Sequence, residues 1–106
     1  MDELVREVGE VMKQAQESVR KISGDFQKKG VTTSAFFHSM IAEQFGQVAH
    51  SYMHGGRHAK DIDVDIADVI LCCLAYLNWL DKDASAAFEK TLQKHKRIVE
   101  ELKRKG

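Results

Sequence analysis

The sequence of 106 residues lacks proline, has no excess of either charge and contains no long hydrophobic run. Without proline, no helix interior is forced to break. Lysine and arginine together number 16, as do aspartate and glutamate, so the net charge does not attract nucleic acid or an acidic membrane. The apolar run from Val69 to Leu80 is too short to span a bilayer. These absences favour a globular protein outside the membrane.

Cysteine is scarce as well. Cys72 and Cys73 are adjacent within the apolar run, and neighbouring residues of a helix cannot form a disulfide without distortion. We therefore expect two buried, reduced thiols. The N-terminal residues alternate charged and apolar side chains and do not resemble a signal peptide. Together these features predict a cytoplasmic location.

Apolar residues recur every three or four positions in four segments, which is typical of amphipathic helices. The first segment, from Leu4 to Phe26, has an eleven-residue repeat that is close to the period of a straight helix. Capping and breaking residues indicate where each helix begins and ends. The first helix is expected to end at Lys28-Lys29-Gly30. The second should begin after Thr32 or Thr33 and run to about His54, where Gly55-Gly56 stops it. The third should begin at Asp61 or Asp63 and end near Leu80, and the fourth should begin at Asp83 or Ser85.

No linker or repeat unit interrupts this pattern, so residues 1–106 are predicted to form one all-α domain, a four-helix bundle with the second and third helices antiparallel. The third helix is apolar nearly all round and therefore needs neighbours on every side. A second copy of the chain would supply them, and we expect a homodimer or a homotetramer. The predicted core residues are Phe37, Ile41, Phe45, Val69, Leu74 and Leu77.

Asp65 and Asp68 lie one helical turn apart just before the apolar run, with Asp61 a further turn back. Residues three apart lie on one face of a helix, so these carboxylates point the same way and repel each other unless a cation or a basic group lies between them. One interpretation is a divalent metal site. The other is an acidic first turn that the helix dipole favours.

The second helix carries a polar stripe at the same spacing. Glu43, Gln47, His50 and His54 follow one another at steps of four, three and four residues. If the stripe faces the aspartates of the third helix, the two helices enclose a polar groove. His50 and His54, with His58 just beyond the glycines, also have the spacing of a transition-metal site; the alternative is that they are solvated or hydrogen-bonded structural residues.

A basic segment lies near the C-terminus, but it indicates a solvated helix end more than a nucleic-acid site. Glu100 and Glu101 interrupt it, no aromatic residues are interleaved with it, and cations are favoured at a helix C-terminus. Its members are Lys94, Lys96, Arg97, Lys103, Arg104 and Lys105.

From about Ser34 to Arg97 the chain resembles the MazG-like family of all-α nucleoside triphosphate pyrophosphohydrolases. The family has a Glu-Glu-x-x-Glu motif on one helix and Glu-x-x-Asp at the start of an apolar helix. The matching stretches are residues 41–49, IAEQFGQVA, and residues 65–71, DIADVIL. A short acidic turn and a helix with Ala87, Lys90 and Arg97 follow, as in such proteins.

The resemblance implies a site for Mg²⁺, with Mn²⁺ as a substitute, held by Glu43, Asp65 and Asp68. It also implies catalytic positions at Glu43, Gln44 and Gln47, while Lys90 and Arg97 would bind the phosphates of a nucleoside triphosphate. The chain departs from the family at three of these positions. Gln44 and Gln47 stand where the family has glutamates, and Asp65 is shorter than the usual glutamate by one methylene.

Two functions are therefore open. The first is a metal-dependent hydrolase that releases pyrophosphate from a nucleoside triphosphate, with activity reduced by the lost carboxylates because Mg²⁺ prefers anionic oxygen ligands. The second is a non-catalytic helical module of the same fold that binds a nucleotide or a protein partner.

Overall fold

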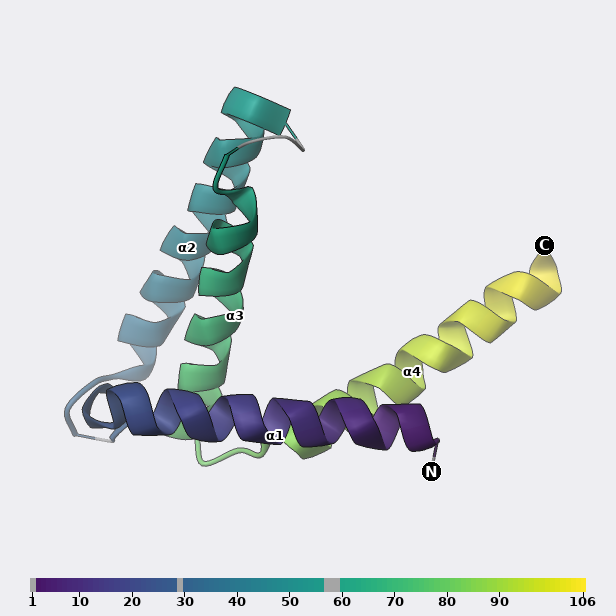
Figure 1. Ribbon diagram of the computed structural model, residues 1–106, viewed down its shortest axis with the longest axis horizontal. Helices are drawn as coiled ribbons and strands as arrows, with labels where there is room; N and C mark the ends of the chain where they lie inside the picture. The colour runs from purple at the N-terminus through teal and green to yellow at the C-terminus, as the bar shows by residue number, and fades with distance from the viewer. Residues whose placement is uncertain (1, 29, 57–59) are drawn as a thin grey trace.

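The computed structural model describes residues 2–28, 30–56 and 60–106, and within them the chain is helical with no β-strand. Figure 1 shows the arrangement. The all-α prediction is confirmed. The elements are α1 (Glu3–Ser23), a short 3₁₀ helix η1 (Gly24–Gln27), α2 (Ser34–Gly55), α3 (Ile62–Trp79) and α4 (Ala84–Lys105).

Local capping residues begin and end the helices close to where the sequence predicts. The Thr33 hydroxyl accepts a hydrogen bond from the Phe36 amide at 3.2 Å, and the Asp83 carboxylate accepts one from the Ser85 amide at 2.9 Å. Each bond satisfies a backbone donor that the first turn of a helix leaves free. Gly56 ends α2 with φ at +59°, a conformation that favours glycine.

The first helix is shorter than predicted. It ends at Ser23, and residues 24–27 continue as the 3₁₀ helix rather than as α-helix to Phe26. At this end the side chain of Gln27 donates through Nε2 to the carbonyl oxygens of Val19 at 3.1 Å and Ser23 at 2.8 Å. This side chain satisfies carbonyls that a continuing helix would have satisfied with backbone amides.

The helices form two antiparallel pairs. Tyr76 of α3 bonds to His38 near the start of α2, and Asp65 near the start of α3 bonds to Ser51 near the end of α2, so the prediction that these two helices are antiparallel is confirmed. In the other pair, Lys96 of α4 lies beside Asp2 at the start of α1. Figure 1 shows the pairs meeting at a corner, with α4 continuing past the start of α1.

The core lies at this corner. Phe37 is 1% exposed and Leu74 is 2% exposed, and the ring of Phe37 stacks on that of Tyr76 with centroids 5.2 Å apart. The predicted core positions Phe37 and Leu74 are therefore confirmed. Among the other predicted core residues, Ile41, Val69 and Leu77 are half-buried.

Phe45 was predicted to belong to the core, and that prediction is wrong for the single chain. It is 65% exposed, because it lies on the side of α2 that does not pack against α3. The apolar periodicity of α2 predicted a buried stripe, but the stripe is covered only near the corner.

Three buried polar side chains join the two pairs at the corner. Asn78 of α3 donates through Nδ2 to the backbone oxygen of Gln16 at 3.1 Å and to the side-chain oxygen of Gln27. Gln16 in turn accepts a hydrogen bond from the Ala84 amide at 2.8 Å, which satisfies a donor at the start of α4. Because each buried group has a partner, the network holds the corner without an unsatisfied polar atom.

Large apolar side chains remain exposed along the whole chain, and Ile22 at 86% and Met53 at 81% are the extremes. The radius of gyration is 16.2 Å, whereas a compact chain of this length has about 13 Å. The single chain is therefore an open arrangement of helices. The other exposed apolar residues include Leu4, Val11, Phe26, Val31, Tyr52, Val64, Ile66, Ile70, Leu71, Ile98 and Leu102.

Candidate functional site

The site predicted from the sequence lies between α2 and α3, and one hydrogen bond sets its register. The Ser51 hydroxyl donates to the Asp65 carboxylate. Gln47 lies four residues before Ser51 and Asp68 three residues after Asp65. With a rise of about 1.5 Å per residue, these two positions stand within about 2 Å of the same height along the antiparallel pair.

Asp65 and Asp68 are both half-buried. Asp68 also acts on Cys72, one turn further along α3. Burial raises the pKa of the Cys72 thiol, and the neighbouring Cys73 and the charge of Asp68 raise it further. The charge of Asp68 is thus close enough to the Cys72 thiol to act on it.

A hollow of about 420 Å³ opens between the end of α2 and the start of α3. It brings together the predicted residues Gln47, His50, His54 and Asp65. Its complete lining is Gln47, His50, Ser51, His54, Gly55, Lys60, Asp61 and Asp65. Sequence reasoning missed Lys60, which adds a positive charge to the rim; its only signal was its place directly before Asp61.

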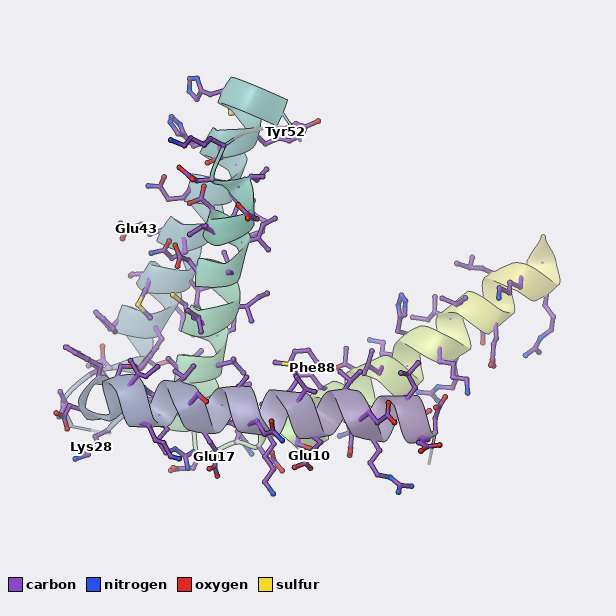
Figure 2. The ribbon with its side chains drawn as sticks, in the orientation of Figure 1. Glu10, Glu17, Lys28, Glu43, Tyr52 and Phe88 are labelled. Carbon is purple, nitrogen blue, oxygen red and sulfur yellow. The ribbon has the colours of Figure 1, made fainter. Side chains whose placement is uncertain are left out.

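Glu43 lies elsewhere. Figure 2 shows its side chain leaving α2 on the side away from α3, and the residue is exposed. It precedes Ser51 by eight residues, which is about 12 Å along the helix axis. Gln44, seven residues before Ser51, lies on the same face of α2 as Ser51 and is half-buried. Of the first motif, then, Gln47 is the residue that lines the hollow together with Asp65.

Lys90 and Arg97 lie on α4, which packs along α1 and points away from the α2–α3 pair (Figure 1). Lys90 and Arg97 are both exposed. Within one chain these cations are not brought to the hollow.

The donors present suit Mg²⁺ only in part. Among residues 2–28, 30–56 and 60–106, no three histidine, cysteine or acidic side chains are already gathered around one point. Asp65 and Asp68 nevertheless fit a common mode of Mg²⁺ binding. In that mode one or two carboxylates bind the ion, and several waters and the substrate phosphates complete its coordination shell. His58, a candidate from the sequence, lies outside the described residues.

Two further predictions from the sequence concern the state of the thiols and the absence of a membrane-spanning segment. Cys72 and Cys73 are free, as expected, but Cys72 is only half-buried and Cys73 is exposed, so the expectation that both thiols are buried is wrong for the single chain. In the part of the chain that the structure describes, no helix has both the length and the apolar character needed to cross a membrane.

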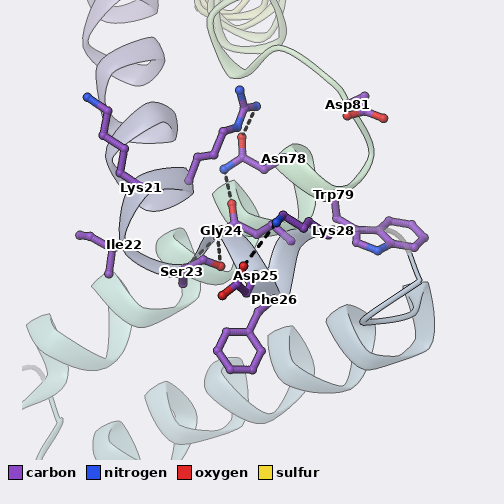
Figure 3. A pocket seen from close by; sticks show the side chains of 12 residues that line it. Lys21, Ile22, Ser23, Gly24, Asp25, Phe26, Lys28, Asn78, Trp79 and Asp81 are labelled. Carbon is purple, nitrogen blue, oxygen red and sulfur yellow. Dashed lines mark hydrogen bonds and ion pairs between the residues drawn. The ribbon is translucent and has the colours of Figure 1, made fainter.

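A second hollow, about 730 Å³, lies at the corner between the end of α1, η1 and the end of α3. Figure 3 shows two of its polar contacts, at Asn78 and between Lys28 and Asp25, as dashed lines. Arg20 donates to the side-chain oxygen of Asn78 at 2.9 Å, and Lys28 pairs with Asp25 at 3.4 Å. This hollow lies beside the polar network that joins the helix pairs. None of the catalytic, metal-binding or substrate-binding residues predicted from the sequence lines it.

Comparison with known protein families, with curated proteins and with solved structures finds no match to this chain. The MazG-like resemblance therefore rests on the motif residues themselves, and its functional implications remain proposals.

Proposed function

We propose that the α2–α3 groove binds a nucleoside triphosphate through Mg²⁺ or Mn²⁺ and hydrolyses it to a nucleoside monophosphate and pyrophosphate. The observation that carries the proposal is the pair of half-buried carboxylates, Asp65 and Asp68, one turn apart on α3. One protein hydroxyl, that of Ser51, bonds to Asp65. A cation would relieve the repulsion between the two carboxylates.

In this proposal Asp65 and Asp68 hold the cation. Glu43, the third ligand that the family motif implies, points away from α3 and would reach the cation only after a change in the helix pair. The bound ion would supply charge neutralisation on the phosphates. The side-chain amides of Gln44 and Gln47 orient water or substrate by hydrogen bonds. An amide has no negative charge and does not take a proton from water as a carboxylate does, so we expect slow turnover.

We also propose that the chain works as a homodimer or a homotetramer in the cytoplasm. The exposed apolar residues of α1, α2 and α3 and the extended shape of the single chain support association. Lys90 and Arg97 are remote from the groove of their own chain, so they would reach phosphates only in the groove of a second copy.

A second candidate function is a non-catalytic module that binds a nucleotide or a protein partner. Two observations favour it. Gln44 and Gln47 replace glutamates of the family motif, and the remaining Glu43 points away from α3. This version keeps the fold and the association of copies but lacks a general base in the groove.

A panel of nucleoside triphosphates, assayed for pyrophosphate release with Mg²⁺ and with Mn²⁺, distinguishes the two functions. The hydrolase predicts metal-dependent release that Asp68→Asn abolishes, while Asp25→Asn, on the distant η1, leaves it unchanged. Nucleotide binding without release supports the non-catalytic module. If no nucleotide is bound or hydrolysed, the nucleotide proposal is wrong.

A further inference from the structure

The hollow at the open end of the α2–α3 pair contains a second set of metal-binding side chains. His50 and His54 are four residues apart on α2, and Asp61 and Asp65 are four residues apart at the start of α3. All four line the same hollow. We infer that these residues form a site for a first-row transition metal such as Zn²⁺, with two imidazoles from α2 and two carboxylates from α3.

The register of the helices matches the four residues in height. His50 directly precedes Ser51, whose hydroxyl bonds to Asp65, so His50 and Asp65 are nearly level. His54 lies three residues beyond Ser51 and Asp61 four residues before Asp65. The two helices run in opposite directions and rise by about 1.5 Å per residue, so His54 and Asp61 are also level along the pair within about 2 Å.

The imidazole rings are already close to each other. Their centroids are 4.3 Å apart and their planes are inclined at 56°. If one metal ion binds at about 2.0–2.1 Å from a nitrogen of each ring, the two ring centroids must lie about this far apart. The four side chains do not yet surround one point, but both histidines and Asp61 are exposed, and exposed side chains change rotamer rapidly.

The carboxylates are available for a cation. Asp61 occupies the N-cap position of α3 without making a side-chain capping bond, and Asp65 accepts a bond from one hydroxyl. The lining of the hollow contains two carboxylates and one ammonium group, that of Lys60. The local charge therefore favours a cation, with Lys60 opposing it.

The donor set selects the metal. Imidazole nitrogen suits Zn²⁺, Ni²⁺ and Co²⁺, whereas Mg²⁺ prefers oxygen ligands and octahedral geometry. This site shares Asp65 with the proposed Mg²⁺ site, but its two histidines and Asp61 have no part in the proposed hydrolase chemistry. Its test measures metal binding alone, so loss of nucleotide turnover would not affect the result.

The test uses the full chain, free of any affinity tag and stripped of metal with a chelator. Zn²⁺ is titrated calorimetrically, and Co²⁺ absorption reports the geometry. We expect one Zn²⁺ per chain with micromolar affinity and visible Co²⁺ bands of tetrahedral coordination. His50→Ala and His54→Ala should each weaken binding by at least about tenfold, since even loss of an outer-shell partner costs that much. Asp61→Asn with Asp65→Asn should weaken it as well.

His95→Ala is the matched control, because His95 is an exposed histidine on the distant α4. Circular dichroism checks that every variant keeps its helices. The inference is overturned by any of three results: no Zn²⁺ binding below millimolar concentration, equal losses in His95→Ala and His50→Ala, or full affinity in the double asparagine variant. One metal per two chains would overturn the assignment to a single chain.

Discussion

The Ser51 hydroxyl donates a hydrogen bond to the Asp65 carboxylate and so joins the end of α2 to the start of α3. The core contacts of this helix pair lie at the other end, around Phe37 and Tyr76. Ser51 therefore links α2 to α3 at the open end of the pair. It also fixes the position of a carboxylate that both proposed metal sites use.

Ser51→Ala removes this hydrogen bond and leaves Asp65 half-buried without its partner. We expect the free energy of unfolding to fall by about 1 kcal/mol, since hydrogen bonds to charged groups contribute about 1.5–3 kcal/mol and partial exposure reduces this. Urea denaturation followed by circular dichroism measures the change. The control is Ser39→Ala, the same substitution at an exposed position of α2; an equal loss there would contradict the role of the bond.

Gly9 allows α1 and α4 to approach closely. A Cβ atom at Gly9 would lie 2.8 Å from Oε1 and 2.9 Å from Cγ of Glu89. Gly9→Ala should therefore destabilise the chain by about 1 kcal/mol through overpacking. In a Glu89→Ala background the same change should stabilise by up to about 1 kcal/mol, because alanine favours helix over glycine.

The native chain, Gly9→Ala, Glu89→Ala and the double variant form a double-mutant cycle. Thermal unfolding of these four proteins measures the coupling free energy between the two positions. If Gly9→Ala has the same effect with and without Glu89, the close contact does not exist in solution.

The exposed apolar side chains predict self-association. Sedimentation at micromolar concentration should show a dimer or a tetramer. Phe45→Glu should shift the protein toward the monomer without loss of helical signal, because a charge at an apolar interface is desolvated at a cost. Ser39→Glu is the control on the same helix. A stable monomer of the native chain would refute the prediction.

Gln44→Glu together with Gln47→Glu should strengthen Mg²⁺ binding. Each added carboxylate brings one negative charge toward a partly desolvated cation that prefers anionic oxygen. Calorimetric titration with Mg²⁺ and Mn²⁺ measures the gain, and Asp68→Asn in the same background should remove it. If neither the native chain nor the double variant binds either ion in the millimolar range, Asp65 and Asp68 do not form a Mg²⁺ site.

Asp2 and Lys96 form an ion pair at the start of α1, with 3.0 Å between Oδ2 and Nζ. The hydrogen bond from Lys96 lowers the pKa of Asp2 from its ordinary 3.8, and the same bond raises the pKa of Lys96 above 10.5. A lowered carboxyl pKa stabilises the fold above pH 3.8 and the effect is lost as pH falls through the folded value. The raised lysine pKa stabilises below pH 10.5 and is lost as pH rises through its folded value.

Asp2→Asn keeps a capping side chain for the Leu4 amide, which Asp2 binds at 2.9 Å, and removes only the charge. We expect a small fall in melting temperature at pH 7 that shrinks at acid pH, where Asp2 is protonated in both states. Glu7→Gln, at an exposed position on the same helix, controls for the loss of one negative charge. A difference that persists unchanged at acid pH would contradict the ion pair.

The helices themselves follow from local signals in the sequence. Thr33 and Asp83 begin α2 and α4 because each places an oxygen against a free amide in the next turn, and Gly56 ends α2 because it accepts a positive φ. Such effects act over a few residues, so they can be recognised from the sequence alone. The end of α1 at Ser23 was not predicted, and the Gln27 side chain that bonds to its last turn gives no recognised stop signal in the sequence.

Only the tertiary structure decided which sides of the helices meet. The spacing of Phe45 and Glu43 predicts an apolar stripe and a polar stripe on α2, and the structure leaves Phe45 exposed and turns Glu43 away from α3. The sequence alone determined the helices and the grouping of the aspartates on α3. The partners of those aspartates depend on how two helices rotate and slide against each other, and that is set by contacts between distant residues such as Phe37 with Tyr76 and Ser51 with Asp65.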